Sequence, residues 1–99
     1  MALDGVSAQA GLRLVAMRPL QVVGQGFQPL EHVTLVATVR DDRVTRRFVA
    51  TRAGRFRVAF RTLYVDRCTS FGVRARGSAG TRATLAQRPL TECPEPAGP

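Results

Sequence analysis

The chain has 99 residues, 44% of them hydrophobic, and a formal net charge of +8 at pH 7. This length allows one domain with a single, modest hydrophobic core. No apolar stretch approaches the roughly 18 residues that a membrane-spanning helix needs. The charged residues Asp4, Arg13 and Arg18 exclude a secretory signal at the start of the chain.

Short segments in which apolar and polar residues alternate follow one another along the chain, and turn residues close each of them. Alternation of this kind is typical of a β-strand with one buried face, and no ten-residue window has apolar residues at helical spacing. Turn signals that recur about every 8–12 residues predict an all-β fold, an immunoglobulin-like antiparallel β-sandwich of about seven strands. The strands are expected over residues 12–18, 20–24, 32–40, 44–51, 55–61, 70–76 and 81–87.

The segments between these strands are rich in glycine, proline and aspartate. In the first long turn, Gly24 and Gly26 allow positive φ, and Phe27 is expected to fold back into the core. The other expected connections are a two-residue turn at Asp41–Asp42, a short hairpin over 52–54 with Gly54 left-handed, a crossover over 62–68 and a four-residue loop over 77–80.

The strand over 44–51 poses a topological problem. In an immunoglobulin-type sandwich its two neighbours along the chain, 32–40 and 55–61, belong to different sheets. The sheet to which this strand belongs therefore stays open; one solution is that the strand changes sheets midway, pairing first with 32–40 and then with 55–61. The core is expected to include Phe56, Val58 and Phe60.

Three regions are expected along the chain. Residues 1–11 have no clear pattern and predict a flexible N-terminal segment, residues 12–93 form the sandwich, and residues 94–99 are a proline-rich tail.

Cys68 and Cys93 are the two cysteines of the chain. In a small β domain such a pair favours a disulfide, which implies an oxidising, extracytoplasmic setting. Two free thiols are the alternative. A bond closing a loop of this size stabilises a protein by about 3 kcal/mol on the chain-entropy model.

The string PLQVVGQGFQPLEHVTLVATV, followed later by TRAGRFRVAF, resembles bacterial secreted immunoglobulin-like modules of the TIG-like kind. The matching residues are Val22, Gly24, Gly26, Phe27, Pro29, Glu31, Val33, Ala53, Gly54 and Phe56. The resemblance implies an extracytoplasmic domain that serves as a spacer, an adhesive or a binding module, with its leader absent from this chain. The chain departs from the family pattern at Leu30, where such modules often have glycine.

The chain offers few residues for catalysis. Its single histidine, His32, begins a predicted strand beside Glu31, a position typical of a surface residue. Asp41 and Asp42 could contribute to a calcium site with Asp66, but a solvated turn explains the pair more simply. We therefore expect no enzyme and no catalytic, cofactor-binding or metal-binding residue.

All fifteen basic residues are arginine. A chain without lysine and rich in alanine, glycine and valine is also typical of a GC-rich genome, so the charge alone does not predict a ligand. Two arginine groups are expected on opposite faces of the sandwich, the second with Arg40 nearby. The candidate anion-binding residues are Arg47, Arg55, Arg57 and Arg61 on one face and Arg74, Arg76 and Arg82 on the other.

The sequence favours a non-catalytic structural or interaction module, either a monomer or part of a larger protein, that meets another protein or an anionic cell-surface polymer. One alternative is an arginine-rich binder of anionic polymers such as wall polymer, polysaccharide or nucleic acid; nucleic acid is the least favoured because most aromatic residues are needed in the core. A second alternative resembles the neocarzinostatin-like carriers of small ligands. It predicts an apolar cavity above about 300 Å³ at one end of the sandwich.

Overall fold

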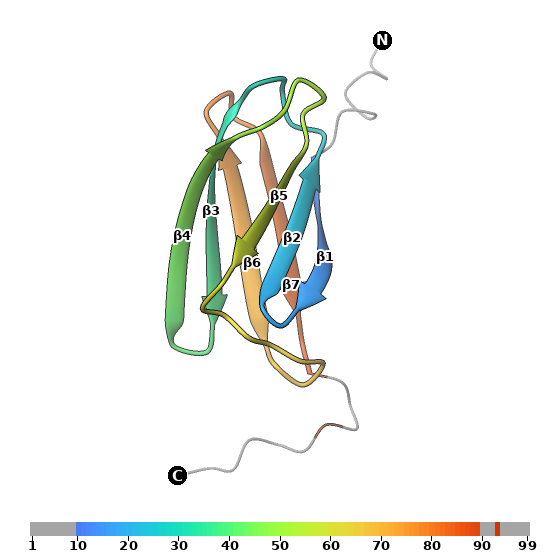
Figure 1. The fold of residues 1–99 in the computed structure, drawn as a ribbon, viewed down its shortest axis with the longest axis vertical. Coiled ribbons are helices and arrows are strands. Elements are labelled where there is room, and N and C mark those ends of the chain that lie inside the picture. Colours follow the sequence, from blue (N-terminus) through green and yellow to red (C-terminus); the bar gives the residue numbers. More distant parts are fainter. Residues whose placement is uncertain (1–9, 90–92, 94–99) are drawn as a thin grey trace.

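The computed structural model describes residues 10–89 and 93, and these residues form seven strands in two antiparallel sheets that face one another (Figure 1). The first sheet contains, in spatial order, β1 (Gly11–Met17), β2 (Leu20–Gln25) and β5 (Phe56–Phe60). The second contains β4 (Asp42–Val49), β3 (His32–Val39), β6 (Phe71–Gly77) and β7 (Arg82–Gln87). The predicted all-β sandwich is confirmed.

The predicted N-terminal segment over 1–11 and the proline-rich tail over 94–99 lie outside the described residues, except for Ala10 and Gly11. Gly11 is already the first residue of β1. Within the described part of the chain, no helix is long and apolar enough to cross a membrane.

The core lies between the two sheets and contains every second residue of the central strands. Phe56, Val58 and Phe60 are buried, as the alternation predicts. Every described side-chain nitrogen or oxygen that is buried has a hydrogen-bond partner. The other fully buried side chains include Leu20, Val22, Val33, Leu35 and Val73.

The fourth strand does not change sheets midway, the solution that the sequence left open. β4 pairs with β3 over its whole length, from Val39 opposite Asp42 to His32 opposite Val49. The chain crosses to the other sheet only in the turn after β4, where Gly54 adopts the expected positive φ of 73°. Because β4 pairs with β3 along its whole length, its backbone has no break at which the chain could leave this sheet. The chain crosses to the other sheet after β4, in a turn where glycine permits a positive φ.

The turn between β3 and β4 is one residue earlier than predicted. It consists of Arg40 and Asp41, because Asp42 already pairs with Val39. Arg40 has a positive φ of 55°. As a result, β4 covers Asp42–Val49 instead of the predicted 44–51, and Arg43 belongs to the strand.

Gly24 and Gly26, which both allow positive φ, serve different purposes. Only Gly26 has it, at 83°. Gly24 lies inside β2 beneath the ring of Phe56, which a Cβ at this position would overlap. Phe27 enters the core as predicted and packs edge-on against Phe56, with ring centroids 4.9 Å apart.

Leu30 adopts a left-handed conformation with φ of 59°. Because a Cβ strains this conformation, we expect Leu30→Gly to be about 1 kcal/mol more stable than Leu30→Ala. Both substitutions remove a side chain that is already 56% exposed, so they differ only in the Cβ. Urea denaturation of the two variants measures the difference, and equal midpoints would contradict the prediction.

Candidate anion-binding face

The outer face of the four-stranded sheet is built around Thr34, Val36 and Thr38 of β3. These residues point away from the core because their neighbours along the strand are buried. Residues directly opposite one another on adjacent strands share a face. The register of β3 with β4 and β6 therefore determines which side chains gather there.

Three rows of side chains cross this face, and together they bring five arginines onto it. The first row is Arg47, Thr34, Arg76 and Arg82; the second is Thr45, Val36, Arg74 and Thr84; the third is Arg43, Thr38, Gly72 and Ala86. All five arginines are exposed. No carboxylate occupies any of these twelve described positions.

A groove of about 510 Å³ lies over this face. Small side chains form part of its lining, at Gly72 and Ala86, and Arg43 and Arg74 contribute guanidinium groups. The small residues leave a hollow that larger side chains would fill. The face therefore combines a shallow depression with hydrogen-bond donors of positive charge.

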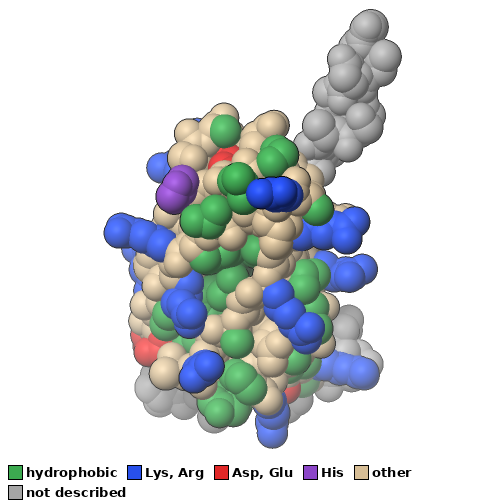
Figure 2. Space-filling model, turned by 45° about the horizontal axis from the view of Figure 1, so that its top comes forward, with side chains coloured by type: hydrophobic (Ala, Val, Ile, Leu, Met, Phe, Trp, Pro, Cys, Tyr) green, Lys and Arg blue, Asp and Glu red, His purple; other side chains and the backbone are tan. Residues whose placement is uncertain are grey.

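The three-stranded sheet carries the other predicted arginine group. Arg57 of β5 and Arg13 of β1 lie on either side of Val23, in one row of its outer face. Arg55 and Arg61 flank β5, and both are exposed. In Figure 2, basic side chains are spread over the surface in view, with apolar and uncharged ones between them.

Two of the predicted arginine positions need correction. Arg47 does not join the β5 arginines but shares a row with Arg76, because β4 belongs to the other sheet along its whole length. Arg40 lies in the β3–β4 turn, at the opposite end of β3 from Thr34.

Arg43 also belongs to this face, although it was not among the predicted arginines. The fourth strand was expected to begin at Val44, whereas it begins at Asp42. Arg43 and Arg47 are four positions apart, and the strand period of two places both on one face.

Glu31 is an acidic residue that lies where three loops meet. It is buried, with only 4% of its surface exposed. Its Oε1 accepts hydrogen bonds from the Gln28 amide at 2.8 Å and the Thr81 hydroxyl at 2.9 Å. Its Oε2 accepts one from the Ala79 amide at 2.8 Å. Burial raises the pKa of Glu31, but these hydrogen bonds lower it by more, so the net shift is downward.

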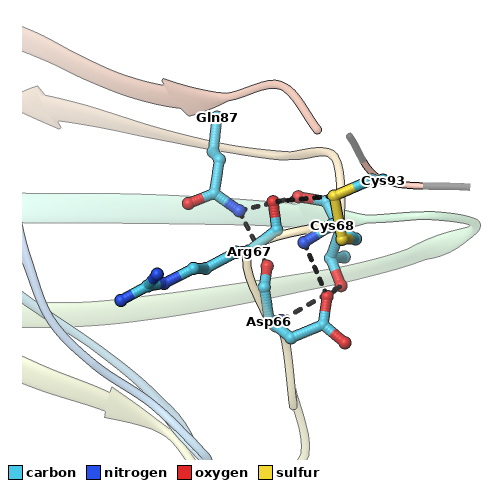
Figure 3. Close-up of a disulfide and its surroundings, with 6 residues drawn as sticks. Asp66, Arg67, Cys68, Gln87 and Cys93 are labelled. Carbon is cyan, nitrogen blue, oxygen red and sulfur yellow. Dashed lines mark hydrogen bonds between the residues drawn. A yellow bond between two sulfur atoms is a disulfide. The ribbon is translucent and has the colours of Figure 1, made fainter. Parts of the chain in front are cut away.

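The Cys68–Cys93 disulfide is present, with its Cα atoms 5.6 Å apart (Figure 3). The turn that holds Cys68 has its own hydrogen bonds. Oδ1 of Asp66 accepts from the Cys68 amide at 2.8 Å and from the Thr69 hydroxyl at 2.9 Å, and both bonds lower the pKa of Asp66. The Gln87 side chain donates to the carbonyls of Asp66 and Thr69.

The remaining candidate residues for chemistry lie apart. His32 is exposed at the start of β3, and Asp41 and Asp42 are exposed at the far end of the β3–β4 hairpin. Within residues 10–89 and 93, no three histidine, cysteine, aspartate or glutamate side chains gather in a way that could hold a metal ion.

No family model matches the chain, and no curated protein matches it.

Proposed function

We propose that this chain is a non-catalytic, extracytoplasmic binding module that holds an anionic polymer on the outer face of its four-stranded sheet. The observation that carries the proposal is the gathering of five arginines and no carboxylate in three adjacent rows. Neighbouring strands are about 5 Å apart, and alternate residues along a strand about 7 Å apart. A polymer with closely spaced anionic groups can therefore contact several guanidinium groups at once.

The arrangement of these arginines opposes folding, which supports a binding role. Arg76 lies directly opposite Arg82 on the neighbouring strand, and like charges in such a pair are destabilising. A surface that serves solubility alone is more stable with both signs of charge interspersed. An anionic ligand removes the repulsion.

The residues of this face favour recognition of a charged backbone. None of its twelve described positions is aromatic, whereas single-stranded nucleic acids are held largely by stacking on aromatic side chains. A wall polymer or an acidic polysaccharide, which presents charge without bases, matches the face better.

Three further observations support the other parts of the proposal. The buried polar residues, Glu31 and Thr69, use their side chains in hydrogen bonds that hold loops, which favours a structural over a catalytic role. The Cys68–Cys93 disulfide favours an oxidising compartment. The resemblance to TIG-like modules points to the same setting.

Charge reversal on this face tests the proposal. We expect Arg74→Glu/Arg76→Glu to lose most of the retention of the protein on a heparin column, because it replaces two attractive groups with repulsive ones. The matched control is Arg57→Glu/Arg61→Glu, on β5 and directly after it, since each pair lowers the formal net charge from +8 to +4. The salt concentration at elution is the measurement, and the control is expected to elute near the wild type.

Equal losses in both double variants would show attraction by net charge alone and would overturn the proposal. A single substitution, Arg82→Glu, provides an independent check. It places opposite charges across β6 and β7, so we expect the same or slightly higher stability together with weaker heparin retention.

A further inference from the structure

A second groove, of about 360 Å³, runs between β4 and β5, where the two sheets end on the same side of the sandwich. Phe48, Phe56 and Val58 supply apolar lining, and Val49 beside them is 47% exposed. Three arginines complete the lining: Arg46, Arg57 and Arg61. The groove is therefore apolar and cationic, and it lies along the side of the sandwich, whereas the carrier hypothesis predicted a cavity at one end.

This groove occupies the place of an absent strand. In sandwiches of the constant immunoglobulin type, a fourth strand extends the first sheet beside the strand that corresponds to β5. Here the fourth strand of the chain pairs with β3 instead. β5 is left as an edge strand, and no described strand pairs with its second edge.

Arg46 partly fills the vacant place. It is opposite the buried Leu35 in the register of β3 and β4, so its side chain starts from the inner face of the sheet. Its Nη1 donates to the carbonyl oxygen of Ala59 on β5 at 3.0 Å. An inward-pointing charge of this kind protects an edge from unwanted pairing. The bond is exposed, so a strand that offers better hydrogen bonds can displace it.

We propose that the β4–β5 groove binds an extended segment of a partner protein, which pairs with β5 as a fourth strand. Backbone hydrogen bonds to a sheet edge supply affinity in such complexes, and alternate side chains supply specificity. The charges select the partner. Its apolar residues pack toward Phe48 and Phe56, and its acidic residues face Arg57 and Arg61.

A second copy of this chain fits the groove poorly. Pairing of β5 with β5 brings Arg55, Arg57 and Arg61 against the same residues of the copy. β4 carries arginines as well, at positions 43, 46 and 47. Like charges on opposed strands are destabilising, so the same residues that attract an acidic segment disfavour a dimer through this edge.

The probe for this proposal is an eight-residue acetylated and amidated peptide of alternating valine and glutamate. We expect saturable binding in a calorimetric titration and slower hydrogen exchange of backbone amides in β5. Arg57→Glu/Arg61→Glu is expected to weaken binding at least tenfold. Arg74→Glu/Arg76→Glu, which alters the opposite sheet, is expected to leave it within twofold of wild type.

Two control peptides test the strand geometry and the charge. A peptide with proline at its two central positions cannot form the ladder, and a valine–lysine peptide has the wrong charge; both are expected to bind at least tenfold more weakly. Equal binding of either control would overturn the proposal, as would self-association of the protein that excludes the peptide. If circular dichroism shows that Arg57→Glu/Arg61→Glu is unfolded, the single substitution Arg61→Glu replaces it. This variant is expected to bind the peptide at least threefold more weakly than the wild type. The results of the heparin experiment are independent of the peptide results, because heparin retention depends on the outer face of the four-stranded sheet.

Discussion

Replacing Glu31 with alanine is expected to lower the free energy of unfolding by about 3 kcal/mol. The carboxylate accepts hydrogen bonds from Gln28, Ala79 and Thr81, and each lost bond to a charged acceptor costs about 1 kcal/mol or more. The melting temperature is therefore expected to fall by about 12 °C or more. Thermal and urea denaturation followed by circular dichroism measure the effect.

The reason for so large an effect is the position of Glu31 between loops. Its side chain joins the β2–β3 loop to the β6–β7 loop, and its main-chain carbonyl accepts from the Ala50 amide of the β4–β5 turn. All three loops gather at one end of the sandwich (Figure 1). The carboxylate also lies against Gly77, where a Cβ would overlap it.

Asp41→Ala is the matched control for Glu31→Ala. Asp41 is an exposed acidic residue in the β3–β4 turn, so its loss is expected to change stability by less than about 0.5 kcal/mol. A Glu31→Ala variant as stable as this control would show that the loop amides find equivalent partners in water.

Stability is also expected to fall below about pH 4.3, the ordinary pKa of glutamate. Folding lowers the pKa of Glu31 and of Asp66, so the unfolded chain binds more protons than the folded one in acid. The stabilisation by these carboxylates is complete above the pKa values of the unfolded chain. It is lost as the pH falls through the lower pKa values of the folded state. Urea midpoints from pH 7 to pH 2.5 test this, and Glu31→Gln is expected to flatten the profile.

Reduction of the Cys68–Cys93 disulfide is the second large effect we expect. The bond joins residues 25 positions apart and is worth about 3 kcal/mol on the chain-entropy model. Loss of the bond is expected to lower the melting temperature by about 10 °C or more. Thermal denaturation with and without reductant, with a thiol assay to establish that the bond has opened, is the measurement.

The local turn is expected to survive this reduction. Asp66 and Gln87 hold the backbone around Cys68 by hydrogen bonds that do not involve sulfur, so the disulfide acts mainly by linking this turn to Cys93 after β7. Cys68→Ser/Cys93→Ser is expected to match the reduced protein. A fully reduced protein with an unchanged melting temperature would contradict the entropic account.

The sequence predicted the strands well because their signal is local. The alternation of Phe56, Val58 and Phe60 with arginines admits only one buried face for β5. Glycine at position 54 predicted a left-handed turn residue correctly, because the requirement comes from one residue's backbone. The disulfide was favoured on similarly simple grounds, since the chain has only two cysteines.

The functional surfaces could not be predicted to the same extent, because each depends on pairing between distant strands. The face on which Arg47 lies depends on the sheet that β4 joins. The residues of β4 do not indicate which sheet that is. Because the β3–β4 turn lies one residue earlier than predicted, Arg43 was not expected to belong to the strand. The burial of Glu31 depends on Ala79 and Thr81, which are 48 and 50 residues away along the chain.

By itself the sequence determined the all-β class, the strand positions and the side of each strand that is buried, since these follow from a two-residue period and from turn residues. Only the tertiary structure decided that β4 extends the sheet of β3 over its full length. That single pairing gathers five arginines on one face and leaves β5 with an open edge beside an apolar groove. The physical reason is that hydrogen-bonded register between strands brings together side chains whose separation along the chain carries no information about their neighbours.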